Sequence, residues 1–473
     1  MRSASWSSTL ASGLVLILGA ASAPATLFAE RPVALVGATV HPVSGPPIAD
    51  GVVVLRAGKI AAVGPRTKVA IPADAEPIDA RGLDLYPAFI NANTVLGLTE
   101  IGSVRGTVDV AEVGSLNPNA RAEVAINPSS ELLPVTRTNG VLLALTAPQG
   151  GLIAGTSALI ALDGWTWEEM TVKAPVAMHV IWPAMGIDRG PKAKKEEEQV
   201  EAREKSIREL HEAFAAAAAY WRARRAEGTR GVPRHDEDVV WAAMRPVVEH
   251  EIPVLVEADN LMQIRAALDW TRTEGLDMIL AGGLDAWRVA PELARRRIPV
   301  ILESVNQLPL RAYEPYDAPY TNAARLHAAG VPVLFSTGTS GFGAANARNL
   351  PYEAAKAVAF GLPHEAAIRG LTLTAAETFG VADRLGSIDP GKDATLILVE
   401  GDPLELNSEV RRAWLAGHEL DLSNRHQLLY EKYNARPKPV NTRAAAAPAA
   451  PKAGEASGGT VIRASERADS GSP

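Results

Sequence analysis

The sequence predicts an α/β protein built on a closed (β/α)8 barrel of the TIM type, with a small flanking β-sandwich contributed by both ends of the chain. Three observations support this fold class. Short apolar runs alternate with amphipathic segments through the middle of the chain, and β-branched runs cluster near each end. The length of 473 residues suits one large domain plus a smaller one, since single cores stop growing near ~250–300 residues.

The two ends of the chain carry the strands of the smaller domain. Val33–Val40 and residues 51–63 are rich in β-branched side chains, and an Ala-Gly pair divides the second run into a hairpin. Similar runs recur at residues 394–399 and 410–415. We therefore predict a composite β-sandwich domain whose segments are residues 30–85 and 384–430.

The middle of the chain, residues 86–383, carries the repeated strand and helix pattern of the barrel. Amphipathic segments such as residues 260–274 and 286–297 separate buried runs, and this order is typical of parallel strands. So many repeats favour a closed barrel over an open sheet. The buried runs are residues 140–146, 252–256, 277–281, 298–302 and 331–335.

A charged, alanine-rich segment at residues 193–227 is predicted to form a helical insertion packed on the barrel rim. Charge runs of this kind usually form a solvated face without a specific role, and we favour that interpretation here. The Gly150-Gly151 pair lacks the spacing of a phosphate-binding loop and indicates a turn.

The first residues predict export. Arg2 precedes an apolar run at residues 10–20, and small residues follow, as in a secretory signal peptide comprising residues 1–29. Cleavage after Ala29 is favoured over cleavage after Ala23. The apolar run is about half of the ~20 residues that a bilayer span needs, so no membrane association is expected once the signal is removed.

Composition limits the remaining classes. There is no cysteine, which excludes disulfides, cysteine-bound zinc and a lipoprotein anchor, and a periplasmic or secreted location follows. The net charge of −7 gives no case for nucleic acid. The segment 431–473 is rich in Pro, Ala, Gly and Ser and is predicted to be a disordered tail.

Residues 371–395, followed by Gly401-Asp402-Pro403, resemble the closing segment of the amidohydrolase superfamily, in particular its imidazolonepropionase-like and prolidase-like branch. Residues 58–64 and 78–82 are similar to its first sheet segments. The strand at 85–90 is similar to the one that leads into its metal motif. The resemblance covers roughly residues 32–420. It implies a barrel with a flanking β-sandwich, and hydrolysis of carbon-nitrogen bonds other than peptide bonds.

Members of this superfamily use one or two divalent ions, such as zinc, to activate water. At the ligand positions implied by the resemblance, the His-x-His pair is replaced by Asn91-Ala92-Asn93, and a histidine by Glu257. Gly282-Gly283 and Gly338 stand where another histidine and an aspartate are expected. Zinc prefers imidazole, thiolate or carboxylate ligands, and the nine histidines include no His-x-His pair. We therefore expect no metal ligands and no cofactor.

The residues that remain at the predicted barrel mouth give the candidate site. Glu257 and Glu303 are candidates for general acid and base, because carboxyl groups facing each other divide these roles between them. The alternative is that these acids cap helices or pair with arginines, and Arg348 could pair with Glu257 or Glu303. Candidates for ligand binding are Asn91, Asn93, Asp259, Asn346 and Arg348.

Three functions stay open from the sequence. The first is an exported amidohydrolase homologue without a metal centre, which binds a small molecule at the barrel mouth or carries out altered chemistry there. The second is an active metal-dependent or prolidase-like hydrolase with ligands not yet identified. The third is a structural partner in a periplasmic assembly. Whether the chain forms a homo-oligomer is left open.

Overall fold

A computed structural model describes residues 31–437 except Pro233 and His235. The predicted signal peptide and residues 438–473 of the predicted tail lie outside this part. Helix α13 (Arg425–Asn434) extends into the segment 431–473. Residues 431–434 are therefore helical and do not belong to the predicted disordered tail. Within the described part, no helix combines the length and apolar character needed to span a membrane.

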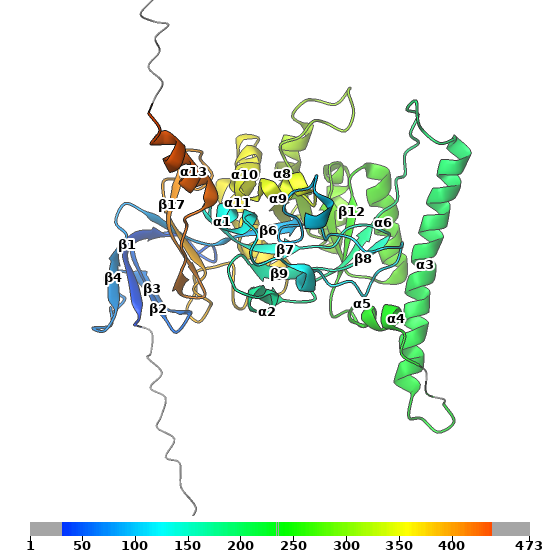
Figure 1. The fold of residues 1–473 in the computed structure, drawn as a ribbon, viewed down its shortest axis with the longest axis horizontal. Helices are drawn as coiled ribbons and strands as arrows, with labels where there is room; N and C mark the ends of the chain where they lie inside the picture. The colour runs from blue at the N-terminus through cyan, green and yellow to red at the C-terminus, as the bar shows by residue number, and fades with distance from the viewer. Residues whose placement is uncertain (1–30, 233, 235, 438–473) are drawn as a thin grey trace, which may run out of the picture. The chain divides into compact units, whose positions relative to one another are not determined.

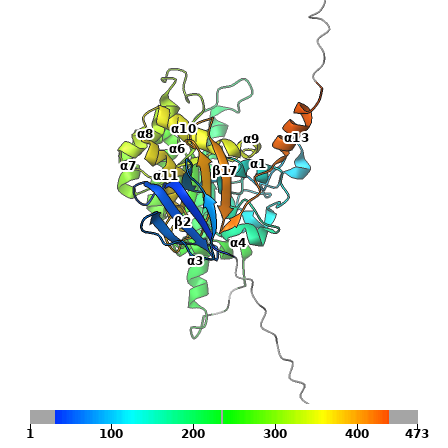
Figure 2. The same cartoon turned by 90° about the vertical axis from the view of Figure 1, so that its left-hand side faces the viewer.

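Strands from both ends of the chain share one sheet, with the order β18-β17-β16-β5-β1-β2-β3 and β4 paired with β1 (Figures 1 and 2). The joint lies where β16 pairs antiparallel with β5. A buried cluster that includes Leu35, Leu85 and Trp414 lines this sheet. The strands are β1 (Val33–Val40), β2 (Ile48–Arg56), β3 (Lys59–Pro65), β4 (Glu76–Asp79), β5 (Asp84–Pro87), β16 (Leu396–Glu400), β17 (Glu409–Leu415) and β18 (His418–Glu419).

The hairpin between β2 and β3 turns at Ala57 and Gly58, as the sequence predicts. Both residues have positive φ, 51° and 77°, which matches the twist of paired strands in a two-residue turn. A side chain at Gly58 would bring its Cβ within 2.8 Å of the Ala416 carbonyl oxygen. The turn after β17 therefore packs directly on this hairpin, and glycine permits the contact.

The middle of the chain forms two further sheets. One has the order β10-β9-β7-β6 and the other β15-β14-β13-β12-β11-β8. A parallel bridge between Thr94 and Gly338 links the end of β6 to the second residue after β15. The strands are β6 (Phe89–Thr94), β7 (Val141–Thr146), β8 (Ile153–Thr156), β9 (Ala158–Ala161), β10 (Thr171–Lys173), β11 (Met178–Ile181), β12 (Val254–Ala258), β13 (Met278–Gly282), β14 (Val300–Glu303) and β15 (Val333–Ser336).

The expected parallel pattern fails at one position. β9 pairs antiparallel with β7, and β8 pairs antiparallel with β11. The reason is the short connection between β7 and β8, where Gly150 and Gly151 adopt φ of 88° and 71°. A turn of this length can reverse the chain, whereas a parallel crossover needs a dozen residues or more. The predicted turn at these glycines is confirmed.

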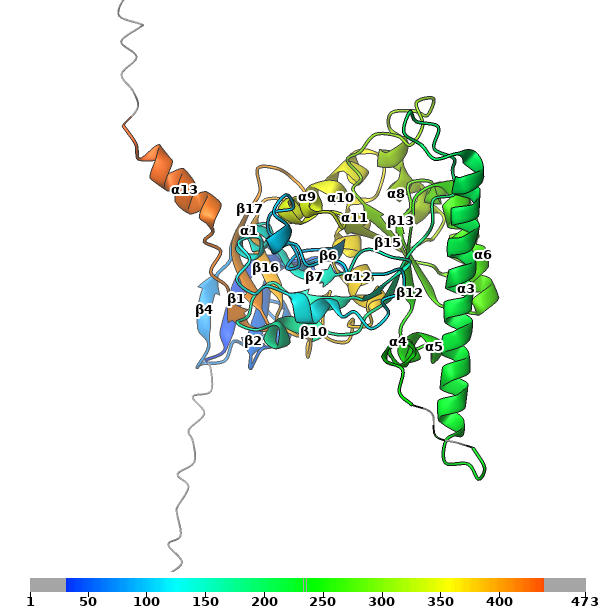
Figure 3. The same cartoon turned by 45° about the vertical axis from the view of Figure 1, so that its right-hand side comes forward.

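The helices lie around these two sheets (Figures 1 and 3). Alternation along β12 separates two buried clusters, with Val254 and Val256 in one and Leu255 in the other. The helices are α1 (Leu132–Arg137), α2 (Trp167–Met170), α3 (Glu196–Ala226), α4 (Val239–Ala243), α5 (Arg245–Val248), α6 (Leu261–Glu274), α7 (Ala290–Arg296), α8 (Ala318–Ala328), α9 (Gly341–Ala345), α10 (Leu350–Ala359), α11 (His364–Leu371) and α12 (Leu373–Thr378).

The charged segment near residues 193–227 forms one continuous helix, α3, of 31 residues. Leu210 and Phe214 are buried on one side of it, and the Phe214 ring meets the edge of Trp270 on α6 with ring centroids 5.0 Å apart. His211 also lies 2.6 Å from Glu274 at the end of α6. The helix is therefore solvated on one side and packed on the other.

Candidate functional site

Polar side chains gather where β6, β12, β14 and β15 end. β12, β13, β14 and β15 run parallel in adjacent positions, so their carboxyl ends meet at the same edge. Asn91 and Asn93 come from β6, Glu257 from β12 and Glu303 from β14. The structure therefore brings together the two predicted acid-base candidates and the two predicted asparagines.

Asn91 joins β6 to the residues after β15. Its amide nitrogen donates to the Thr337 hydroxyl at 2.9 Å, and its amide oxygen accepts from the Thr337 backbone nitrogen at 3.4 Å. The Ser336 hydroxyl donates to the backbone oxygen of Asn93, and Gly338 N–H donates to the same hydroxyl at 2.8 Å. Both polar groups of the Asn91 side chain thus stabilise the contact between the two strand ends.

Asn93 lies against the carboxyl pair. Its amide nitrogen donates to Glu303 Oε1 at 2.5 Å, and the Asn93 side chain also lowers the pKa of Glu257. Asn93 is fully buried, and its amide oxygen has no hydrogen-bond partner. Buried amide oxygens are normally satisfied, so this unpaired oxygen beside the carboxyl groups leaves an acceptor that a donor from a ligand could satisfy.

Glu257 and Glu303 perturb each other. Both keep some exposed surface but have protein on most sides. Burial, followed by the charge of Glu257, raises the pKa of Glu303 well above its ordinary value. Burial also raises the pKa of Glu257, against the hydrogen bonds from Gln149 (3.2 Å) and Asn93. Two interacting acids with raised pKa values tend to share one proton, as in acid-base pairs of enzymes.

Asp259 is the third acid of this edge. Burial raises the pKa of its carboxyl, partly offset by a hydrogen bond from the Leu284 backbone, and the charge of Asp285 raises it further. A Cβ at Gly282 would lie 2.5 Å from Asp259 Oδ1, and Gly282 has φ of +85°. Glycine at the end of β13 therefore leaves the room that the Asp259 side chain occupies.

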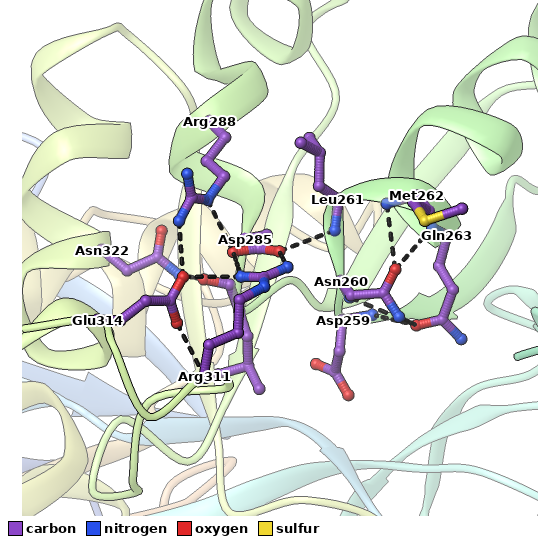
Figure 4. Close-up of polar contacts among 11 residues, drawn as sticks. Asp259, Asn260, Leu261, Met262, Gln263, Asp285, Arg288, Arg311, Glu314 and Asn322 are labelled. Atoms are coloured by element: carbon purple, nitrogen blue, oxygen red, sulfur yellow. Dashed lines mark hydrogen bonds and ion pairs between the residues drawn. The ribbon is translucent and has the colours of Figure 1, made fainter. Parts of the chain in front are cut away.

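A buried charge cluster next to Asp259 was not predicted from the sequence (Figure 4). Arg311 donates to both oxygens of Asp285, at 3.0 and 2.6 Å, and Arg288 donates to the same carboxylate at 2.9 Å. Glu314 accepts from both arginines. Burial alone would raise the pKa of Asp285, but the hydrogen bonds from Arg311, Leu261 and Arg288 lower it.

This cluster holds the segment after β14 in place. Arg311 and Glu314 belong to the segment between Glu303 and α8, while Asp285 precedes η3 (Ala286–Val289). Neither Arg311 nor Asp285 lies in a recognisable motif, so their pairing, 26 residues apart, becomes apparent only in the fold.

The structure does not bring Asn346 and Arg348 to the carboxyl pair. The Asn346 amide donates to the Phe342 backbone oxygen at 2.9 Å. Arg348 lies 3.4 Å from His426, and its backbone oxygen accepts from Asn139. The predicted alternative, in which Arg348 pairs with Glu257 or Glu303, is therefore wrong.

His179 on β11 is buried on the same side of the strands as Leu255, its partner in register. Both ring nitrogens lack a hydrogen-bond partner, and burial lowers the pKa of the imidazole to about 3. Glu257 follows two residues after Leu255, so His179 lies one layer deeper than the carboxyl pair. Within the described residues, no three His, Cys, Asp or Glu side chains form a group that could hold a metal ion.

Comparisons with known proteins agree with this fold. Residues 318–425 match the model of the amidohydrolase family. Amidohydrolase tasK of Hapsidospora irregularis is 23% identical over 371 residues, which are 73% of this chain and 37% of that relative. An amidohydrolase structure from Thermotoga maritima MSB8 superposes with a TM-score of 0.71 at 24% identity, over 82% of this chain and 99% of that one.

These comparisons support the amidohydrolase superfamily for this chain. The predicted resemblance is thereby confirmed at the level of the superfamily. A structure of molinate hydrolase shares the fold more distantly, with a TM-score of 0.54 and 16% identity over 88% of this chain and 99% of that one. The matched stretch spans little more than a third of the length of tasK, so the activity of that protein as a whole does not carry over.

Proposed function

We propose that this protein is an exported member of the amidohydrolase superfamily that binds a small molecule at the carboxyl ends of its strands, without the divalent-metal centre of the superfamily. One observation carries the proposal. Asn93 hydrogen-bonds to Glu303, and burial raises the pKa values of both Glu303 and Glu257. The pair lies at strand ends where the resemblance to the superfamily leads us to expect a metal ion that activates water.

The proposed architecture around the site is a closed (β/α)8 barrel with a flanking β-sandwich. The bridge between Thr94 and Gly338 supports closure, because it joins the sheet that ends at β6 to the sheet that ends at β15. The consecutive strands β8 and β9 support the second junction, since one pairs with β11 and the other with β7. If β8 and β9 count as one strand, the ring has eight strands, in the order β6, β7, β8/β9, β11, β12, β13, β14 and β15. The β8/β9 strand is antiparallel to its two neighbours in the ring.

The strand ends carry carboxyl groups, but among the described residues no three His, Cys, Asp or Glu side chains converge closely enough to hold a zinc ion. Zinc is held mainly by imidazole, thiolate and carboxylate groups. The Asn91 amide is occupied on both sides by Thr337, and the Asn93 nitrogen faces Glu303. His179 lies one layer deeper than the carboxyl pair. We therefore assign no catalytic step to a metal in this protein.

The carboxyl pair can supply chemistry of its own. When one proton is shared, one carboxyl can donate a hydrogen bond and the other can accept one, which is the division of roles in acid-base catalysis. Gln149 and Asn93 orient the two groups through their amide nitrogens. We infer that turnover of a bound ligand, where it occurs, proceeds by proton transfer at Glu257 and Glu303.

Elemental analysis of the purified full chain tests the proposal, together with calorimetric titration of zinc, manganese and nickel. We expect substoichiometric metal and weak binding of all three ions. Stoichiometric, tightly held metal would overturn the metal-free interpretation in favour of a metal-dependent hydrolase. On a panel of amides and esters, any activity found should be abolished in Glu257→Gln and retained in Glu198→Gln, which changes an exposed acid on α3.

A further inference from the structure

We propose that the ligand of this site carries an organic cation, a primary ammonium or amidinium group, that binds between Asn93, Glu257 and Glu303. The inference rests on the proposed function, because it names the chemical class of the molecule bound at the same strand ends. Hydrogen bonding and charge support it independently.

The balance of donors and acceptors at the strand ends favours a ligand that donates. The Asn93 and Gln149 amide nitrogens are both directed at the carboxyl groups, at 2.5 Å from Glu303 and 3.2 Å from Glu257. The group that remains unsatisfied is an acceptor, the buried Asn93 Oδ1. A buried acceptor without a partner costs about 1–3 kcal/mol, and an N–H donor from a ligand would remove that cost.

Neighbouring carboxyl charges raise the pKa values of all three acids, and a positive ligand would relieve that repulsion. Within the described residues, no basic side chain contributes to the pKa values of Glu257, Glu303 or Asp259, whose shifts arise from burial, hydrogen bonds and neighbouring carboxyl groups. An ammonium or amidinium group offers both the charge and the N–H donors that these groups lack.

The two arginines of the charge cluster beside Asp259 cannot supply that charge. Arg288 and Arg311 donate to Asp285 and Glu314, so the four side chains together are neutral. Figure 4 shows the Asp259 carboxylate pointing away from this cluster. Neither of these two arginines could turn towards the acids at the strand ends without breaking a buried ion pair.

A bare divalent ion fits the same oxygens less well. Such ions are surrounded by six or more oxygen ligands in the case of calcium, or by a near-ideal octahedron in the case of magnesium. Here two amide N–H groups already occupy lone pairs of the carboxyl oxygens, which reduces the oxygen ligands left for such a shell. An N–H donor ligand adds hydrogen bonds to the free lone pairs and leaves the amides where they are.

Isothermal titration calorimetry with the full chain tests the inference. The probes are benzylamine and benzamidine as cations, benzyl alcohol as the neutral analogue, benzoate as the anion, and magnesium and zinc chloride. We expect both cations to bind at least about tenfold more tightly than benzyl alcohol. Glu303→Gln and Glu257→Gln should each weaken benzylamine binding about tenfold or more, whereas Glu198→Gln should leave it unchanged.

The outcomes separate this inference from the proposed function. Equal binding of benzylamine and benzyl alcohol, or preference for benzoate, would overturn the cationic ligand while leaving a small-molecule site. A chain that binds none of the organic probes would speak against both. Stoichiometric magnesium or zinc that excludes benzylamine would also overturn both. If a glutamate variant does not fold, the test rests on the unaltered chain alone, through its relative affinities for benzylamine, benzyl alcohol and benzoate.

Discussion

The side-chain nitrogen of Asn93 on β6 lies 2.5 Å from Glu303 Oε1 on β14, across 210 residues of sequence. This contact satisfies part of a carboxyl group that burial and Glu257 drive towards its protonated form. It also positions a buried, unpaired amide oxygen beside the carboxyl pair. This contact, the raised pKa of Glu303, the Arg311–Asp285 ion pair and the packing of α3 each have a measurable consequence.

Replacing Asn93 with alanine should destabilise the protein. The change leaves Glu303 without its amide donor and opens a small cavity at a fully buried position. We expect a loss of about 1–3 kcal/mol in the free energy of unfolding at pH 7, measured by urea denaturation. The exposed Asn306 provides a control, since Asn306→Ala should change the stability by less than about 0.5 kcal/mol. Equal effects would show that Asn93 has no special electrostatic surroundings.

Replacing Glu303 with glutamine should stabilise the protein at high pH. Because the pKa of Glu303 is raised in the folded state, the folded protein holds a proton that the unfolded chain releases. Stability is therefore lost as the pH rises from the ordinary glutamate pKa to the raised pKa of the folded state, by about 1.4 kcal/mol for each pH unit between them. Denaturation from pH 4 to pH 9 should show a smaller decline for Glu303→Gln. Parallel curves for both proteins would contradict the raised pKa.

Arg311→Ala should destabilise the protein and loosen the segment after β14. The Asp285 carboxylate is 2% exposed and receives two hydrogen bonds from Arg311, so removing the guanidinium leaves a buried charge only partly compensated. We expect a loss of about 3 kcal/mol in chemical denaturation and faster proteolysis within residues 304–317. Arg295→Ala removes an arginine whose side chain is 73% exposed and should have little effect. A stable Arg311→Ala protein would show that the cluster is not needed to order this segment.

Phe214→Ala should reveal whether α3 is an integral part of the fold. The Phe214 ring is buried against Trp270, and truncation of a buried phenylalanine typically costs about 3–5 kcal/mol. The thermal unfolding midpoint should therefore fall by several degrees, whereas Glu198→Ala on the exposed part of the same helix should not alter it. An unchanged midpoint for Phe214→Ala would make α3 an independent surface helix.

Local pattern predicted most of the strands and helices. β-branched runs and the Ala57-Gly58 turn locate β1, β2 and β3, and the apolar runs of the middle segment coincide with β7 and β12–β15. The antiparallel pairing of β8 with β11 and of β9 with β7 was not predicted, because it depends on the length of the preceding turn and on which strands lie beside this segment. Pattern within a strand does not contain that information.

The site was predicted in part for the same reason. Asn93, Glu257 and Glu303 stand at the ends of recognisable strands, so alternation and strand order suffice to bring them together. Arg348 follows the last strand too, yet the loop turns it towards His426. The Asp285 and Arg311 pair joins two irregular segments, whose course is decided by tertiary contacts and not by periodicity.

The pairing of β5 with β16 also constrains the order in which the protein can assemble. β5 ends at residue 87, but its partner begins at residue 396, so the sheet edge at β5 stays open until nearly the whole chain has been synthesised. An open edge of this kind is a template for pairing with other chains. The nascent protein therefore depends on its last strands to close the first ones, and a chain truncated before β16 should aggregate rather than fold.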